Sequence, residues 1–289
     1  MDSQILAKLL SGKHIGTNSK IFSFGDILKL SEQNSNVLFW VKKKHISKIN
    51  FRNFNGIIIS DSLIPEPITQ IIVDNPRISF SKAISIVFPQ QLNKDLLSQN
   101  SFIGSNVIIG KNLMLGQNVV IESDCVIGNN VKIDHNSVIK SHTKIGNNVN
   151  IGASTTIGGS GFGYEKDSQG KYKKIEHYGS VFIDDEVNIG DNVTIDRGTI
   201  GYTKICKNVK IDNQVHIAHN SFIGFNTIIT AGVVVSGSVI VGENCWLGPN
   251  STINNKASFP NNSKLGIGSV MLKKVINEGT YFGIPIKKA

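Results

Sequence analysis

The sequence predicts a mainly β protein: a parallel β-helix of about eight coils, preceded by a small α/β domain and followed by a short C-terminal cap. Three observations support this fold class. An aliphatic residue recurs every six positions between Ile103 and Leu265, with two interruptions. Glycine often follows that aliphatic residue, as at Gly104 and Gly110. Residues 1–98 have no such repeat, so they form a separate domain.

The six-residue repeat defines the coil domain, which we expect to span residues 99–268. The register is unbroken from Ile103 to Ile157, resumes at Ile183, slips by four residues, and then runs from Ile205 to Leu265. A short strand with an inward aliphatic side chain, followed by a tight corner at Gly or Asn, accounts for this period. Three such units close one triangular coil of about 18 residues, and stacked coils bury a continuous apolar column.

Two interruptions break this register. Ile157 and Ile183 are 26 residues apart, which is not a multiple of six. We therefore expect residues 158–180, rich in Gly, Lys and Asp, to leave the coil as an exposed loop. Loops that break a rigid solenoid are commonly functional, although a tolerated insertion gives the same pattern. The second interruption is the slip of four residues, which falls in TIGYTKIC.

The flanking segments differ from the coil. In residues 1–98, the stretches NVLFWV, NGIIISDSL and TQIIVDNP are typical of short strands, and SFSKAISIVF has helical spacing with Ser79 as a candidate N-cap. Residues 269–289 leave room for one strand and a tail. We expect this segment to cap the last coil, because the open end of a solenoid must be covered.

Composition restricts the function classes. The mean hydropathy is −0.02, and no run approaches the ~18 apolar residues of a membrane span, so we expect at most peripheral membrane association. MDSQILAKLLSGKHIG lacks the features of a secretory leader, which favours a cytoplasmic location. Three cysteines far apart predict neither a disulfide framework nor a metal site. The net charge of +9 is a weak signal, and its basic residues are not interleaved with aromatics, so no nucleic-acid binding is expected.

A candidate catalytic pair follows from the repeat. His219, in NQVHIAHN, stands two residues after the inward Ile217, so its ring projects outward from a rigid strand. The equivalent position one coil later, 18 residues on, is Gly237. An imidazole beside a bare backbone N–H provides a general base and an oxyanion donor for attack on a thioester. Asp212, seven residues before His219, is the candidate group that orients the ring.

Four stretches carry a resemblance to a known family. GGSGFGY, VTIDRGTIG, KIDNQVHIAHN and VVVSGS, in that order and spacing, resemble the UDP-3-O-acylglucosamine N-acyltransferases of lipid A synthesis. The resemblance implies a left-handed β-helix and a homotrimer whose active sites lie between neighbouring coils. It also implies transfer of a 3-hydroxyacyl group from acyl carrier protein to the 2-amine of a UDP-linked 3-O-acylglucosamine. No cofactor is implied beyond the phosphopantetheine of the carrier.

The resemblance also assigns roles in substrate binding. IVDNPR and VLFWVKKKH are similar to the family's N-terminal uridine-binding domain, in which Phe39 matches the aromatic that stacks on uracil. Lys42 and His45 stand where the family motif has Asn and Tyr, so two of the three nucleotide contacts are altered. Asn213 is a further candidate substrate-binding residue. Lys256 replaces a second histidine expected 37 residues after the catalytic one, and a lysine there retains a phosphate contact but not a neutral imidazole.

Two other functions remain open on the sequence. One is an N-acetyltransferase or related acyltransferase that uses acyl-CoA and another nucleotide-linked amino sugar. The other is a β-helix without catalysis that serves only in binding or assembly. The pairing of His219 with Gly237 argues against the second, and donor assays separate the first from the lipid A enzyme.

Overall fold

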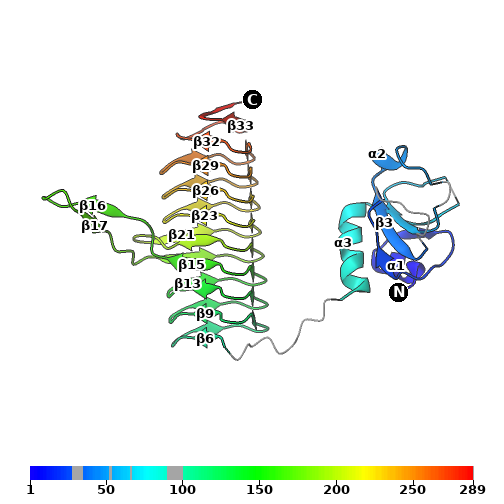
Figure 1. Ribbon diagram of the computed structural model, residues 1–289, viewed down its shortest axis with the longest axis horizontal. Helices are drawn as coiled ribbons and strands as arrows, with labels where there is room; N and C mark the ends of the chain where they lie inside the picture. The colour runs from blue at the N-terminus through cyan, green and yellow to red at the C-terminus, as the bar shows by residue number, and fades with distance from the viewer. Residues whose placement is uncertain (28–34, 52–53, 66, 90–99, 289) are drawn as a thin grey trace. The chain divides into compact units, whose positions relative to one another are not determined.

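The computed structural model describes residues 1–27, 35–51, 54–65, 67–89 and 100–288 (Figure 1). The chain divides into two compact units, Met1–Leu92 and Asn93–Ala289. The predicted boundary at residue 98 lies outside the described residues. Each unit is described separately below.

The N-terminal unit contains a five-stranded sheet with the strand order β1-β5-β4-β3-β2. Strand β1 pairs antiparallel with β5, and the other neighbours are parallel. The predicted strands in NVLFWV, NGIIISDSL and TQIIVDNP are present as β3, β4 and β5. The bounds are β1 (Lys13–Ile15), β2 (Ser23–Phe24), β3 (Val37–Val41), β4 (Ile57–Ser60) and β5 (Thr69–Ile72).

Three helices accompany this sheet: α1 (Ser3–Leu9), α2 (Lys43–Ile46) and α3 (Pro76–Val87). Helix α3 packs against β3 and β4. The prediction that Ser79 caps this helix is wrong, because Asn75 is the N-cap and its side chain accepts a hydrogen bond from the Ile78 N–H at 3.3 Å. Pro76 follows at the first helical position, where a missing N–H costs nothing.

The second unit is a parallel β-solenoid of six-residue repeats, as predicted (Figure 1). Its strands stack into three faces of nine, eight and ten strands. The first face holds β6 (Phe102–Ile103), β9 (Val120–Ile121), β12 (Val138–Ile139), β15 (Thr156–Gly159), β20 (Thr194–Asp196), β23 (His216–Ile217), β26 (Val234–Val235), β29 (Thr252–Ile253) and β32 (Val270–Met271). The second face holds β7 (Ile108–Ile109), β10 (Val126–Ile127), β13 (Thr143–Ile145), β18 (Ser180–Ile183), β21 (Tyr202–Ile205), β24 (Phe222–Ile223), β27 (Ile240–Val241) and β30 (Ser258–Phe259).

The third face completes the triangle. It holds β8 (Met114–Leu115), β11 (Lys132–Ile133), β14 (Asn150–Ile151), β19 (Asn188–Ile189), β22 (Lys210–Ile211), β25 (Ile228–Ile229), β28 (Trp246–Leu247), β31 (Lys264–Leu265), β33 (Thr280–Gly283) and β34 (Ile286–Lys288). The solenoid therefore has more coils than the predicted eight, because stacking continues beyond Leu265 into β32 and β33. Strand β33 pairs parallel with β31 and antiparallel with β34.

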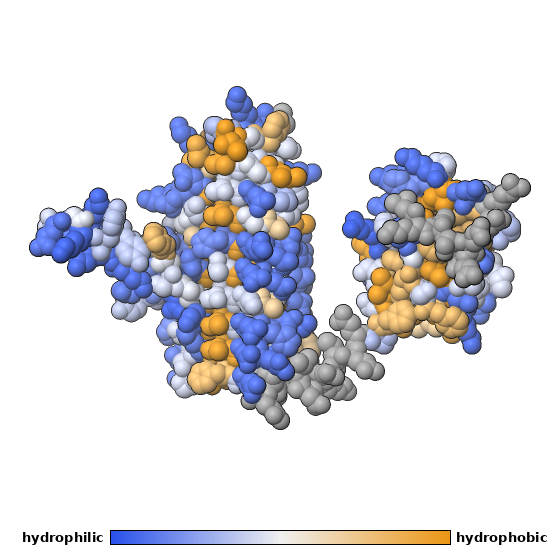
Figure 2. Space-filling model, viewed as in Figure 1, coloured by the Kyte–Doolittle hydropathy of each residue, from blue (hydrophilic) through white to orange (hydrophobic). Residues whose placement is uncertain are grey.

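The repeat explains both the core and the corners. From β8 onward, the recurring apolar residue of the repeat is buried in one continuous cluster that runs from Leu115 to Tyr281, whereas Ile103 and Ile109 in the first two strands are exposed. Corner residues adopt positive φ, the left-handed region that Asn tolerates best among residues with side chains. Their amides form ladders between coils: Asn112 donates to Asn130 at 2.8 Å, and Asn130 donates to Asn148 at 3.0 Å. Figure 2 shows apolar side chains in a broken column along the coil between polar flanks.

Both interruptions of the repeat have structural counterparts. The first is an excursion that leaves the coil after β15 and returns at β18, with an antiparallel ribbon of β16 (Tyr164–Lys166) and β17 (Tyr172–Lys174) at its centre (Figure 1). The second is an enlarged corner at residues 197–201, between β20 and β21. Because of this corner, residues stacked from β18 to β21 are 22 positions apart instead of 18. Among the described residues, no helix is long and apolar enough to cross a membrane.

Candidate active site

The geometry of His219 and Gly237 agrees with their predicted juxtaposition. His219 follows β23 at the corner between the first and second faces, and Gly237 occupies the same corner one coil later. A Cβ atom added to Gly237 would lie 2.6 Å from Nε2 and 2.7 Å from Cε1 of His219, so the ring covers the glycine. No described residue accepts a hydrogen bond from the Gly237 N–H. An imidazole nitrogen and an unused backbone donor therefore meet at one corner.

The other ring nitrogen of His219 contacts its chain neighbour. Its Nδ1 lies 3.2 Å from Oδ1 of Asn220. That amide is also bound to the enlarged corner: Oδ1 accepts from the Thr199 N–H at 2.9 Å, and Nδ2 donates to the Ile200 carbonyl at 2.7 Å. The imidazole of His219 is thus oriented by the Asn220 amide, whose oxygen and nitrogen are both hydrogen-bonded to the enlarged corner.

A carboxylate lies beside this corner. Asp196, at the end of β20, has a side chain only 14 % exposed, and its Oδ2 lies 3.8 Å from Nε2 of His216. Nδ1 of His216 lies 2.7 Å from the Thr194 hydroxyl oxygen. Burial raises the pKa of the Asp196 carboxyl, and the three neighbouring imidazoles of His216, His219 and His177 oppose that shift. The corner therefore combines one carboxyl group with three imidazoles.

The excursion supplies the third imidazole. His177 is 8 % exposed, and its ring packs edge-on against the His219 ring, with 5.3 Å between the centroids. Nδ1 of His177 lies 2.9 Å from the Ile175 carbonyl oxygen, while Nε2 is buried without a partner among the described residues. Gly161 lies against both side chains, since a Cβ there would be 2.7 Å from Nε2 of His177 and 3.1 Å from Cβ of His219. The GGSGFGY segment therefore folds back over the corner.

Two of the predicted site residues are not brought to His219. The carboxylate of Asp212 accepts the Asn213 N–H at 2.8 Å, so its predicted role in orienting the ring is contradicted. The reason is positional: Asp212 follows β22, at a different corner of the triangle. Asn213 lies at that same corner, where its Oδ1 accepts the Asp191 N–H at 2.7 Å as part of a ladder. Lys256, by contrast, is adjacent to the site, because its N–H donates to the Gly237 carbonyl at 2.9 Å.

The nucleotide residues predicted in the N-terminal unit separate in the structure. Lys42 and His45 line a cavity of about 270 Å³ beside α2, together with Lys48 and the apolar Ile49. Phe39 is only 2 % exposed and packs edge-on against Phe54, with 5.4 Å between the ring centroids. The expectation that Phe39 offers its ring to a uracil is not met, because the side chain lies within the apolar core of the unit.

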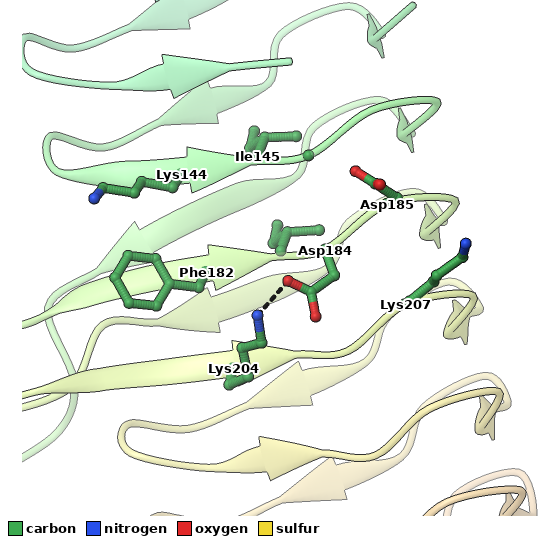
Figure 3. A pocket seen from close by; sticks show the side chains of 9 residues that line it. Lys144, Ile145, Phe182, Asp184, Asp185, Lys204 and Lys207 are labelled. Atoms are coloured by element: carbon green, nitrogen blue, oxygen red, sulfur yellow. Dashed lines mark hydrogen bonds and ion pairs between the residues drawn. The ribbon is translucent and has the colours of Figure 1, made fainter. Parts of the chain in front are cut away.

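A second charged cavity lies on the second face of the coil (Figure 3). Its volume is about 510 Å³, and its charged groups are largely paired. Lys204 contacts the Asp184 carboxylate, and Lys207 lies 3.0 Å from Glu186. Lys144 extends over the ring of Phe182, 5.3 Å from its centroid. This internal neutralisation gives the cavity little attraction for an anion, so we do not assign the active site to it.

Three residues at the corner were missed by sequence reasoning. Asn220 is adjacent to His219, but its role depends on Thr199 and Ile200, which the slip of four residues moves out of register. Asp196 lies at the start of the same irregularity. His177 lies in the excursion, whose contacts the repeat does not predict. The signal available in the sequence was the position of the two interruptions: His177 lies within the first, Asp196 lies directly before the second, and the second provides the partners of Asn220.

Comparisons with known proteins agree with the repeat. The family model described as bacterial transferase hexapeptide (six repeats) matches residues 124–159. The model described as hexapeptide repeat of succinyl-transferase matches residues 99–139 and 238–258. Among solved structures, a UDP-N-acetylglucosamine acyltransferase superposes with a TM-score of 0.60 at 22 % identity and covers 65 % of this chain and 71 % of that chain. The enzyme of that name from Francisella novicida gives a TM-score of 0.61 at 22 % identity, with coverage of 66 % and 68 %. These similarities establish the fold.

Sequence relatives are closer. Proteins named UDP-3-O-acylglucosamine N-acyltransferase from two strains of Helicobacter pylori are 38 % and 40 % identical over 232 residues, covering 74 % of this chain and 69 % of each relative. The protein of the same name from Helicobacter hepaticus is 47 % identical over 190 residues, with coverage of 61 % of this chain and 58 % of that protein.

Proposed function

The chain belongs to the UDP-3-O-acylglucosamine N-acyltransferase family, and we propose that its own reaction is transfer of a 3-hydroxyacyl group from acyl carrier protein to the 2-amino group of UDP-3-O-(3-hydroxyacyl)glucosamine. The observation that carries the proposal is the ring of His219 lying over Gly237, whose backbone N–H is unused. This pairing is what direct transfer from a thioester to an amine requires. The identity of the acyl donor and of the acceptor is inferred from the family to which the chain belongs.

The reaction proceeds in two proton transfers. Nε2 of His219 takes a proton from the amine as the amine nitrogen attacks the thioester carbonyl carbon. The carbonyl oxygen gains negative charge and accepts a hydrogen bond from the Gly237 N–H, which stabilises the tetrahedral intermediate. The C–S bond then breaks, and the departing thiolate of phosphopantetheine receives the proton from His219. No covalent intermediate with the protein forms.

The N-terminal unit provides a candidate site for the nucleotide of the acceptor. The cavity beside α2 places Lys42, His45 and Lys48 around one space, which suits the uridine diphosphate portion of the acceptor: the lysines pair with phosphate, and the imidazole stacks on the base. Lys256, next to Gly237, provides a further cation at the catalytic corner. Crystals soaked with UDP-N-acetylglucosamine test this part, because a nucleotide bound elsewhere would contradict it.

The assembly proposed is a homotrimer of left-handed β-helices. A triangular prism has flat faces, and the first face carries outward apolar side chains at Phe102, Val120, Val138 and Val234. These side chains are available to a second copy of the chain, and in a closed ring of three copies they would pack against a different surface of the next copy. Light scattering should give the mass of three chains of 31.4 kDa. An active monomer at micromolar concentration would contradict the assembly.

The decisive experiment compares His219→Ala with the control His142→Asn. His142 is an exposed corner histidine at positive φ, and asparagine suits that backbone. We expect His219→Ala to lower kcat/KM about 10²–10⁴-fold with 3-hydroxyacyl carrier protein and to leave the fold intact. The control should retain activity. Near-normal turnover of His219→Ala rejects the assignment, and equal rates with carrier and with the same acyl-CoA favour the alternative acyltransferase that uses acyl-CoA.

A further inference from the structure

We propose that Asn220, clamped by the enlarged corner at residues 197–201, is the positioning residue that holds His219 in the tautomer with its proton on Nδ1, so that Nε2 is free to act as the base. This inference rests on the proposed function, in which His219 is the general base. It also explains the four-residue slip in the repeat, which the reaction described above does not use.

The orientation of the Asn220 amide is fixed by the enlarged corner. Its Oδ1 accepts from the Thr199 N–H at 2.9 Å, and its Nδ2 donates to the Ile200 carbonyl at 2.7 Å. Turning the amide over would place its N–H against the N–H of Thr199 and its oxygen against the carbonyl of Ile200, which would lose both bonds. A third bond, from the Asn220 N–H to the Thr203 hydroxyl at 2.8 Å, fixes the backbone of Asn220.

The corner is built to admit this side chain. Gly198 lies against the amide, since a Cβ at that position would be 2.9 Å from Nδ2 of Asn220 and 2.9 Å from the Tyr202 nitrogen. Asn220 itself has a φ of 59°, in the left-handed region. A regular step of six residues between inward side chains contains no residues equivalent to Thr199 and Ile200. The ten-residue step from Ile195 to Ile205 provides both of them.

The fixed amide determines the proton position on His219. A carbonyl oxygen only accepts hydrogen bonds, so the contact of 3.2 Å between Oδ1 and Nδ1 requires that Nδ1 carries the hydrogen. In the neutral ring, Nε2 then has the lone pair. This is the nitrogen that faces Gly237, where a Cβ would lie 2.6 Å away. The lone pair therefore lies on the same side as the oxyanion donor.

The other groups that face His219 do not set its tautomer. Asp196 lies nearby, but the ion pair of its carboxylate is with His216 at 3.8 Å. His177 meets the His219 ring edge-on at 5.3 Å, and its own Nδ1 is occupied by the Ile175 carbonyl. Lys256 reaches the corner through its backbone bond to Gly237. Among the described residues, Asn220 alone forms a hydrogen bond with the His219 ring.

The first test reads the tautomer without substrate. In the full chain with ¹⁵N-labelled histidine, the ring resonances of His219 are assigned by their loss in His219→Gln. We expect a protonated Nδ1 and an unprotonated Nε2 in the neutral ring, and a shift toward protonated Nε2 in Asn220→Gly. A wild-type ring protonated on Nε2 overturns the inference, whatever reaction the protein performs. Absence of acyl transfer with a normal tautomer rejects the proposed function alone.

The second test uses activity and a matched control. Asn220→Gly keeps the left-handed backbone and removes the amide, and Gly198→Ala displaces the same amide from the other side. We expect both to lower kcat/KM about 10- to 100-fold, a part of what a general base contributes. Asn226→Gly is the control, because Asn226 has a φ of 57° and its amide lies in a ladder away from His219. Equal loss in Asn220→Gly and Asn226→Gly overturns the inference.

A pH profile separates positioning from stability. Asn220→Asp also tolerates the left-handed backbone, but it places a carboxylate against Nδ1 and favours the protonated ring. We expect the limb of the rate profile that reports the base to move to higher pH in Asn220→Asp, and to stay in place in Asn226→Asp. An unchanged profile in both variants contradicts a role of Asn220 at the ring.

Discussion

The close approach of Gly237 to His219 makes Gly237→Ala the sharpest test of the catalytic corner. A Cβ at this position would lie 2.6 Å from Nε2 and 2.7 Å from Cε1 of His219, whereas ordinary van der Waals contact begins near 3.4 Å. The ring must therefore move by close to 1 Å. A displacement of about 1 Å at a reacting group costs on the order of 10²-fold in rate, or about 2.7 kcal/mol of transition-state stabilisation.

Stability should respond differently from activity in this variant. The φ of Gly237 is not in the left-handed region, so alanine fits the backbone and restricts the unfolded chain by about 0.4–1 kcal/mol, which offsets part of the clash. The control is Gly170→Ala, at φ 79° in the excursion, where a Cβ meets nothing within 4 Å. We expect this control to lose about 1 kcal/mol of stability through backbone strain and to keep its activity.

The assay measures kcat/KM with 3-hydroxyacyl carrier protein and thermal unfolding by circular dichroism for both variants. Gly237→Ala should lose activity with a midpoint close to that of the wild type, and Gly170→Ala should show the reverse. Full activity of Gly237→Ala would refute the reasoning, because the base and the oxyanion donor would not then depend on this contact.

Three further predictions use other parts of the structure. Burial raises the pKa of the Asp196 carboxyl, so the stability that its protonated form contributes is present below the unfolded pKa of about 3.9 and is lost as the pH rises. The melting temperature of Asp196→Asn, relative to that of the wild type, should therefore increase between pH 4 and pH 7. A difference in melting temperature that stays constant over this range would contradict the prediction. Replacing the exposed Lys273 and Lys274 by Glu should slow transfer from acidic carrier protein at low salt but not from acyl-CoA, and the effect should shrink at 0.5 M salt, where screening is strong; equal effects on both donors would argue against carrier docking at this end of the coil. Burial raises the pKa of the Cys125 and Cys245 thiols, so a thiol reagent should modify both only after unfolding in urea, and rapid labelling of the folded chain would contradict their burial.

The coil was predictable because each unit obeys the same local rule. An inward aliphatic residue and a corner that tolerates positive φ are repeated every six residues, so neither depends on distant contacts. The stacking of His219 on Gly237 follows from that rule, since the coil between them is regular. The start of α3 is signalled by Asn75 followed by Pro76, whereas Ser79, which is also a residue type that caps helices, lies within the first turn of the helix.

The remaining site residues were less predictable for two different reasons. The distance along the sequence suggested that Asp212 orients His219, but strand β23 lies between them, so the two side chains belong to different corners of the triangle. The sequence motif places Phe39 in an open nucleotide site. Successive side chains of β3 point to opposite faces of the sheet, however, and both faces are covered by apolar residues. Only the folded sheet determines which face of such a strand remains accessible.

The proposed catalytic corner lies where the regular repeat is interrupted. A regular coil presents the same small set of corner groups at every level, and its Asn side-chain amides are used in ladders between coils. The excursion brings His177 against the His219 ring and Gly161 against its Cβ, and the enlarged corner holds the Asn220 amide that contacts Nδ1 of the ring. Both irregularities precede His219 in the chain and converge on it in space, while the regular coil that follows provides the N–H of Gly237, for which no described residue is an acceptor. The rigid repeat therefore fixes the distance between the proposed base and the oxyanion donor. The two interruptions provide His177 and the partners of Asn220, which contact the ring of His219 or orient it.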